Sequence, residues 1–323
     1  MLRVIAPGAL CTVQDLGRAG YQRFGVPLGG AMDRVACAIA NRLVGNLPTS
    51  ACVEITAGGA VFEVVEPCVV AVAGADLVAT LNGEPLPMWM SVYLATGRRI
   101  AFERRRSGAR AYLALAGGVD APVVLGSRST YLPGSFGGLD GRALQMDDLI
   151  RPVPGRSQRD LVRLAGCAWP AAVDYTPLIR ILSCQHARDL LPSADVASLT
   201  AHPWRVGAAS NRIGVRLEGP PIRASQSRDV ASFGVFPGVI QLPPDGLPIL
   251  LMADAQPTGG YPVVAVVIQA DLHRAAQALP GDELRLVWTT IGEATQAWRE
   301  LQRLLALPVE EDDGTALAAA SRG

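Results

Sequence analysis

Apolar residues in the first half of the chain fall in short runs, and glycine- or proline-containing turns separate one run from the next. Runs of this kind, rich in valine and other strand-forming residues, predict β-strands. The expected strands are residues 61–65, 68–72, 77–81, 91–94, 100–102 and 111–116. Their close spacing is typical of an antiparallel barrel or sandwich, and not of alternating strands and helices.

One segment near the N-terminus has a helical period instead. Apolar side chains recur there on one helical face, at Met32, Val35, Ala36, Ile39, Ala40 and Leu43. Gly45 supplies a stop at the C-terminal end. We therefore expect an amphipathic helix over residues 31–44 that packs on the β-structure.

The strand pattern resumes in the second half, at residues 179–182, 212–217, 239–241, 249–252, 263–268 and 283–288. A helical stripe of apolar residues follows between Ile291 and Leu305. The proline- and glycine-containing polar segment 151–158 is the best candidate for a boundary. We expect an N-terminal lobe over residues 1–155, a C-terminal lobe over residues 156–308 that ends in a helix, and a mobile tail over residues 309–323.

Composition agrees with two well-packed domains. The chain has 323 residues, of which 50% are hydrophobic and 18% charged. The formal net charge is zero, so no global electrostatic attraction to nucleic acid or to an anionic membrane is expected. The densest basic run, Arg104 to Arg106, is interpreted as a solvated turn.

All 29 basic residues are arginine, because the sequence contains no lysine. This excludes a Schiff base, a P-loop lysine and a biotinylated lysine on this chain. The six cysteines show no C-x-x-C spacing and the three histidines are scattered, so we expect no metal site. Since neither a signal peptide nor a long apolar run is visible, we expect a cytoplasmic protein with reduced thiols.

Two N-terminal segments combine charge with glycine. Asp15 and Arg18 lie in a turn-rich stretch that is either an anion-holding loop or a turn fixed by an internal pair of opposite charges. Gly29 and Gly30 lead into the expected helix, where Asp33 is either part of an anion site or simply a favourable residue of the first turn. A longer loop over residues 126–142 carries hydroxyls and arginines, and its Arg128 and Ser129 are candidate binding residues.

Candidate chemistry in the second half lies on three segments. Asn211, Arg212 and Arg216 form either a two-guanidinium face or the solvent side of an edge strand. The turns at residues 237–246 and 253–262 bracket an apolar strand, and their polar content favours ligand binding over a plain hairpin. Gln241, Asp245, Gly259 and Gly260 are candidate binding residues, and Asp254, Gln256, Thr258 and Tyr261 are candidate catalytic residues.

Several of these motifs, in the same order, resemble one known family. They are Asp15-Leu16-Gly17-Arg18, Gly29-Gly30-Ala31-Met32-Asp33, residues 40–46, residues 126–131, Ser210-Asn211-Arg212 and Gly259-Gly260-Tyr261-Pro262. The chain is similar to the biotin-dependent carboxyltransferase family, which is also known as allophanate hydrolase subunit 2 or KipA-like. The resemblance runs from about Val4 to Leu286.

The resemblance implies a mostly β fold of two cyclophilin-like β-barrel lobes with a few short helices. It implies the C subunit of an ATP-dependent 5-oxoprolinase, which hydrolyses 5-oxo-L-proline to L-glutamate together with a KipI-like companion (the B-type subunit) and a lactam-utilisation protein (the A-type subunit). ATP would be used by the complex, and no cofactor would be bound covalently to this chain. The alternatives are a carboxyltransferase that takes carboxyl from biotin on a separate carrier to a urea-like acceptor, and a non-catalytic KipA-like regulator.

The chain departs from the family pattern mainly in its second half. Phe233 stands where family members carry glutamate, and Pro257 replaces a threonine. The usual Gly-Pro-Gln is replaced around residues 183–185, and a Gly-Asp turn reads Asp147-Asp148. Our leading hypothesis is that Asp254, Gln256, Thr258 and Tyr261 orient a small lactam or amide, while Arg18, Arg128, Arg212 and Arg216 offset negative charge that develops during the reaction.

Overall fold

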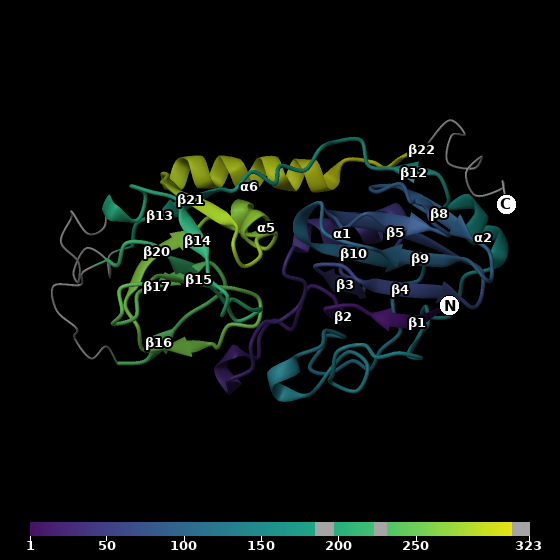
Figure 1. Cartoon of the computed structure of the whole chain (residues 1–323), viewed down its shortest axis with the longest axis horizontal. Helices are drawn as coiled ribbons and strands as arrows, with labels where there is room; N and C mark the ends of the chain where they lie inside the picture. Colours follow the sequence, from purple (N-terminus) through teal and green to yellow (C-terminus); the bar gives the residue numbers. More distant parts are fainter. Residues whose placement is uncertain (185–196, 223–230, 312–323) are drawn as a thin grey trace. The chain divides into compact units, whose positions relative to one another are not determined.

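The computed structural model describes residues 1–184, 197–222 and 231–311, and β-strands dominate it (Figure 1). The chain divides into two compact units. The first contains Met1–Arg18, Gly29–Val173 and Leu305–Gly323, and the second contains Ala19–Leu28 and Asp174–Leu304. The prediction of a mostly β fold with few short helices is confirmed.

The first unit is built from two antiparallel sheets. The six-stranded sheet has the order β11 (Leu149–Ile150), β1 (Leu2–Pro7), β4 (Ala60–Val64), β9 (Arg99–Phe102), β6 (Ala79–Leu81) and β7 (Glu84–Pro85). The five-stranded sheet has the order β2 (Leu10–Gln14), β3 (Cys52–Thr56), β10 (Ser107–Leu115), β5 (Cys68–Asp76) and β8 (Ser91–Leu94). Alternate residues of both sheets, such as Phe62 and Leu113, belong to one hydrophobic core.

Helix α1 (Arg34–Leu43) contacts β5, β10 and β3 of the five-stranded sheet. It begins three residues later than its apolar stripe suggests, because Asp33 is the N-cap and its Oδ1 accepts a hydrogen bond from the Ala36 amide at 2.9 Å. It ends before Gly45, whose φ of +66° is left-handed and stops the helix as expected.

The second unit contains a closed barrel. Its strand order is β13 (Leu178–Leu182), β20 (Val263–Val267), β17 (Val239–Gln241), β18 (Ile249–Leu251), β15 (Gly214–Glu218), β14 (Trp204–Val206) and β21 (Glu283–Trp288). The only parallel pair in the described barrel joins β13 to β21. A separate ribbon pairs β16 (Phe233–Gly234) with β19 (Thr258–Gly259).

Short helical elements complete the described fold. They are α2 (Gln158–Arg163), α5 (Leu272–Ala275), α6 (Ile291–Ala306) and the 3-10 turns η1 (Gln22–Phe24), η2 (Leu132–Gly134) and η3 (Gln269–Asp271). Helix α6 coincides with the predicted C-terminal stripe. None of the helices in the described ranges is long and apolar enough to cross a membrane.

The longest segment of the first unit ends at Val173, and the longest segment of the second begins at Asp174, later than the boundary at residue 155 that proline and glycine suggested. Residues 156–173 remain with the first unit because α2 contacts β5, and β12 (Cys167–Ala168) contacts β8. Strand β12 also pairs with β22 (Glu310–Glu311), so the first residues of the expected mobile tail form a strand. Residues 312–323 of that tail lie outside the described residues.

A turn of the first unit offers a test of backbone strain. Asp147 is exposed and has a left-handed φ of +68°, at the position where a Gly-Asp turn was expected. A residue with a side chain is strained in this conformation by roughly 1–2 kcal/mol, and glycine avoids that strain. Glycine regains only part of this energy in stability, because it loses more backbone entropy on folding. We expect Asp147→Gly to be more stable than Asp147→Ala by about 1 kcal/mol in urea denaturation. Equal stabilities of the two variants would contradict this account of the turn.

Candidate functional site

The glycine- and hydroxyl-rich segments singled out in the N-terminal half come together in the first unit. The amide of Ala31 donates to the carbonyl oxygen of Asp15 at 2.8 Å. A Cβ on Gly30 would lie only 2.5 Å from the Gly17 nitrogen, and Gly30 has a φ of +86°. Glycine is therefore required where the loop before α1 crosses the turn after β2.

The carboxylate of Asp15 fastens this turn to the segment 127–130. Its Oδ1 accepts hydrogen bonds from the Gly17 amide at 2.7 Å, the Ser127 hydroxyl at 2.7 Å and the Ser129 hydroxyl at 2.5 Å. Its Oδ2 accepts one from the Arg128 amide at 2.6 Å. Asp15 is 8% exposed, so these donors replace solvent around a buried charge. The contacts favour a structural role for Asp15 over direct anion binding.

Arg18 reaches the same segment. Its Nη2 donates to the Ser129 carbonyl oxygen at 2.5 Å, and its guanidinium lies 4.9 Å from the centre of the Phe136 ring. The loop with Phe136 packs closely here, because a Cβ on Gly138 would overlap the Thr130 hydroxyl. Ser129 therefore contacts both Asp15, through its hydroxyl, and Arg18, through its carbonyl oxygen. The three predicted residues stabilise one another.

Arg128 is the partly accessible guanidinium of this region. Its Nη1 lies 3.0 Å from Asp120 Oδ1 and also donates to the Ala121 carbonyl oxygen. Its side chain is 28% exposed. Arg128 is therefore better placed than the buried Arg18 to meet a soluble anion.

A row of buried polar side chains crosses the five-stranded sheet, and the sequence analysis did not predict it. Glu54 on β3 lies opposite Thr12 on β2 and Tyr112 on β10. Glu54 Oε2 accepts hydrogen bonds from the Tyr112 hydroxyl at 2.7 Å and the Met32 amide at 2.9 Å. The available signal was a glutamate between the apolar residues Val53 and Ile55.

Tyr112 links this row to the start of α1. Its hydroxyl accepts a hydrogen bond from the Asp33 amide at 2.7 Å. Burial, and after it the nearby Glu54 carboxylate, raise the pKa of Tyr112 well above its ordinary value, so the phenol stays protonated and donates to Glu54. The predicted residue Asp33 is thus the N-cap of α1, and its amide is bound by Tyr112 of the five-stranded sheet.

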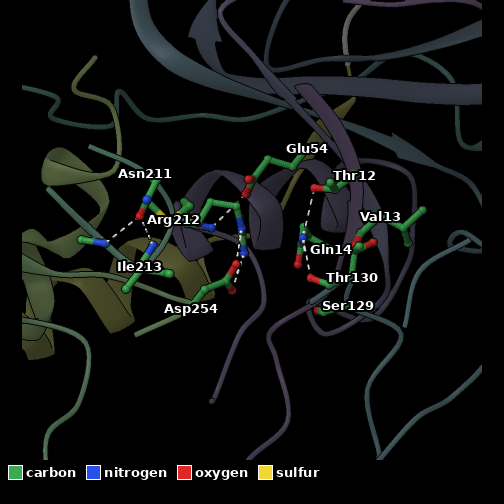
Figure 2. A network of polar contacts seen from close by, with 12 residues as sticks. Thr12, Val13, Gln14, Glu54, Ser129, Thr130, Asn211, Arg212, Ile213 and Asp254 are labelled. Carbon is green, nitrogen blue, oxygen red and sulfur yellow. Dashed lines mark hydrogen bonds and ion pairs between the residues drawn. The ribbon is translucent and has the colours of Figure 1, made fainter. Parts of the chain in front are cut away.

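Gln14 lies at the end of β2 beside this row. Figure 2 shows its side chain between Thr12 and Thr130. Its Nε2 donates to Thr12 Oγ1 at 3.0 Å and to the Thr130 carbonyl oxygen at 3.2 Å. Its Oε1 is buried and has no hydrogen-bond partner among the residues that the structure describes.

In the second unit, two predicted residues form a buried ion pair. Arg212 Nε and Nη2 donate to Asp254 Oδ2 and Oδ1 at 2.8 Å and 3.0 Å (Figure 2). The Asp254 amide also donates to the Arg212 carbonyl oxygen at 2.9 Å. The two side chains are 7% and 2% exposed. Such a bidentate pair holds the start of β15 against the turn that follows β18.

The remaining residues of the predicted catalytic group lie in and around β19, which follows that turn. Gln256, Thr258 and Tyr261 are exposed, whereas Asp254 is buried. Gly259 packs on Gln241, because a Cβ at Gly259 would lie 2.5 Å from Gln241 Nε2. The structure therefore separates one buried acid from three accessible polar side chains.

Arg212 and Arg216 do not share one face. Arg212 precedes β15 and is buried, whereas Arg216 lies on the strand and is exposed. Strand β15 pairs with both β14 and β18, so it is not an edge strand either. Asn211 Oδ1 accepts hydrogen bonds from the Ile213 and Gly214 amides, and Asp245 Oδ1 accepts one from Leu247, so both side chains shape turns. Gly260, the next residue after β19, is exposed.

No group of three or more residues suited to metal binding occurs in the described part of the chain. At the main departure from the family pattern, Phe233 is half-buried and packs against a hydrophobic cluster that includes Val235, Val239 and Leu251. Pro257 retains its ladder contact, because its carbonyl oxygen accepts from the Val235 amide at 2.9 Å.

Comparison with known proteins gives consistent matches over most of the chain. The family profile described as carboxyltransferase domain, subdomain A and B, matches residues 24–288. The chain is 37% identical to the C subunit of 5-oxoprolinase from Escherichia coli, over 94% of this chain and 96% of that protein. It is 30% identical to the C subunit of 5-oxoprolinase from Haemophilus influenzae, over 93% and 95% respectively.

Among solved structures, the urea amidolyase of K. lactis superimposes with a TM-score of 0.85 and 30% sequence identity. The match covers 94% of this chain but only 20% of that much larger protein.

The crossing of Gly30 over the turn at Gly17 can be tested with a matched glycine. Gly20 has a similar φ of +93°, but nothing lies within 4 Å of an added Cβ there. Both Gly30→Ala and Gly20→Ala incur the backbone penalty, and only Gly30→Ala adds overlap with main-chain atoms. We expect Gly30→Ala to be less stable by roughly 1–3 kcal/mol in denaturant titrations. Equal losses would show that the loop can move away from the turn.

Because Arg212 and Asp254 form a buried pair, we expect the effects of their substitutions on stability to be strongly coupled. Arg212→Met or Asp254→Leu alone removes a buried bidentate contact between opposite charges and should cost about 3–5 kcal/mol of unfolding free energy. The double variant should be much more stable than the sum of the single losses predicts. The exposed pair Arg106–Asp76, at 2.8 Å, is the control and should show a coupling of at most about 1 kcal/mol. Additive losses at Arg212 and Asp254 would rule out a tightly coupled pair.

Proposed function

The chain belongs to the carboxyltransferase domain family, subdomains A and B, and from this premise we propose that it is the C subunit of an ATP-dependent 5-oxoprolinase. The observation that carries the proposal is the end-to-end match to two proteins of that name, which spans 96% and 95% of their lengths. The substrate would be 5-oxo-L-proline, a small lactam, and the product L-glutamate.

The proposed activity requires partner proteins. We infer a KipI-like companion of the B type and a lactam-utilisation protein of the A type. ATP would be used by the assembled complex. The lack of lysine supports this division of roles, since this chain cannot supply a P-loop lysine to nucleotide phosphates.

The geometry of the second unit suggests how the proposed substrate is handled. Gln256, Thr258 and Tyr261 are exposed on the segment that follows β18 and offer hydrogen-bond donors and acceptors to a lactam. Asp254 is held by Arg212, so we propose that it positions this segment and does not itself transfer a proton. Arg216 of the same unit is exposed and offers a guanidinium group to a substrate carboxylate.

A second candidate is carboxyl transfer from biotin on a separate carrier to a urea-like acceptor. The structural match to urea amidolyase favours it. This chain corresponds to only a fifth of that urea amidolyase. The other steps of such a reaction would therefore be carried out by other chains. Without lysine, this chain cannot carry biotin itself.

The remaining alternative, a KipA-like regulator, anticipated Phe233 at a protein interface. The ring instead packs on the hydrophobic cluster of its own unit and is half-buried. This position gives the regulator hypothesis no support.

Reconstitution tests the main proposal. The chain mixed with its A-type and B-type partners should hydrolyse ATP only when 5-oxo-L-proline is present and should release glutamate in equal amount. Omission of this chain should abolish the coupled reaction. Transfer of labelled bicarbonate to urea, dependent on a biotinylated carrier, would instead select the second candidate. A complete complex without lactam turnover would refute the assignment as 5-oxoprolinase.

A further inference from the structure

We propose that Cys37 and Cys52 are a redox-sensitive pair, which an oxidant converts into a disulfide that joins helix α1 to strand β3. Cys37 lies in the first half of α1, and Cys52 is the first residue of β3. Their Sγ atoms are 3.1 Å apart, and both cysteines are free thiols. The pair lies within the first unit, and this inference does not depend on the proposed substrate.

The two sulfur atoms are already close to bonding distance. Carbon atoms that are not bonded to each other rest about 3.5–4.0 Å apart, and sulfur is larger than carbon. One thiol therefore donates a hydrogen bond to the other at 3.1 Å. Since a disulfide bond is about 2.05 Å long, the sulfur atoms need to approach each other by only about 1 Å.

The segment between the two cysteines is also held in the conformation that a disulfide would require. Cys37 and Cys52 are 15 positions apart in the sequence. Asn41 Nδ2 donates to the Cys37 carbonyl oxygen at 3.2 Å and to the Ser50 carbonyl oxygen at 2.8 Å, and so connects the two ends of the segment. Cys52 is fixed on its other side by strand pairing with Gln14. Oxidation would therefore close a loop that the folded chain already forms.

The reaction needs an electron acceptor, which we assign to a low-molecular-weight disulfide such as glutathione disulfide. The thiolate of one cysteine attacks a sulfur atom of glutathione disulfide, and the first glutathione leaves. The other cysteine attacks the protein sulfur of this mixed disulfide, forms the Cys37–Cys52 bond and releases the second glutathione. The two thiol protons of the protein are taken up by the two glutathione thiolates. One disulfide is reduced for each one formed.

Burial decides when this reaction takes place. Both cysteines are 0% exposed, so glutathione disulfide cannot reach them in the closed fold. Burial, and after it the hydrogen bond with Cys37, also raise the pKa of Cys52 well above its ordinary value, so little thiolate forms there. The first attack therefore occurs while the chain folds or when α1 separates locally from the sheet. Once formed, the disulfide is protected from reductants by the same burial.

The cross-link would fix the part of the first unit on which its polar network depends. Cys37 follows the N-cap Asp33, whose amide donates to Tyr112. Cys52 begins the strand that carries Glu54, and Glu54 accepts from the Met32 amide before α1. A disulfide between α1 and β3 would hold these hydrogen bonds together under oxidising conditions.

Peptide mapping tests the cross-link. The full chain is incubated with glutathione disulfide in urea too dilute to unfold it, alkylated and cut with trypsin, which cleaves after arginine. Cys37 lies in the peptide Val35–Arg42, whereas Cys52 and Cys68 share the peptide 43–98. We expect the two peptides to be linked with the loss of two hydrogen atoms. The link should persist in Cys68→Ala and disappear in Cys52→Ala. Dithiothreitol should cleave it in the denatured chain much faster than in the folded chain.

Thermal unfolding tests the effect on stability. A cross-link across a loop of this length should raise the unfolding midpoint by roughly 5–10 °C relative to the same chain reduced with dithiothreitol. Cys11 is equally buried, on β2, and serves as the matched control. Cys11→Ala should retain the difference between the oxidised and reduced chains, and Cys37→Ala should abolish it.

The half-buried Cys184 shows whether the oxidant was active, because it can form a mixed disulfide without opening of α1. Glutathione on Cys184 without a Cys37–Cys52 link, even after the chain is refolded with glutathione disulfide, would overturn the proposal. A link that leaves the unfolding midpoint unchanged or lowers it would also contradict it. If the alanine variants do not fold, the unaltered chain with and without dithiothreitol still decides between these outcomes.

Discussion

The carboxylate of Asp15 is the contact on which the candidate site of the first unit depends. It joins a turn after β2 to hydroxyl and amide groups that lie more than 110 positions later in the chain. The loop before α1 then crosses the same turn through Gly30, and Arg18 holds the other side of Ser129. Loss of the carboxylate would leave four buried donors without an acceptor. The turn and the segment 127–130 therefore stabilise each other.

Two buried carboxylates among the predicted site residues, one in each unit, hold the protein itself. Asp15 is surrounded by protein donors, and Asp254 is paired with Arg212. Among the predicted residues of the second unit, exposed side chains are those of Gln256, Thr258, Tyr261 and Arg216. Amide, hydroxyl and guanidinium groups of this kind can donate hydrogen bonds to a small polar molecule.

Glu54 shows why part of the candidate site escaped sequence reasoning. Its strand, Cys52–Thr56, is short and has buried residues on both sides, so it lacks the alternation that marks a half-buried strand. Strands β1 and β2 were missed as well, although β8, β17 and β21 lie where the pattern placed them. The glutamate acquires its significance only through pairing with Thr12 and Tyr112 from two other strands.

The sequence by itself determined the β-rich architecture, the helix before Gly45 and the family, because these follow from local periodicity, turn residues and motif order. Only the tertiary structure decided which polar groups are already occupied. Arg212 and Arg216 look equivalent in sequence, yet one is buried against Asp254 and the other is exposed. Gln14 looks like an ordinary strand residue until Thr12 and Thr130 orient its amide. Strand register and long-range packing choose these partners, and a linear pattern of residue types does not contain that information.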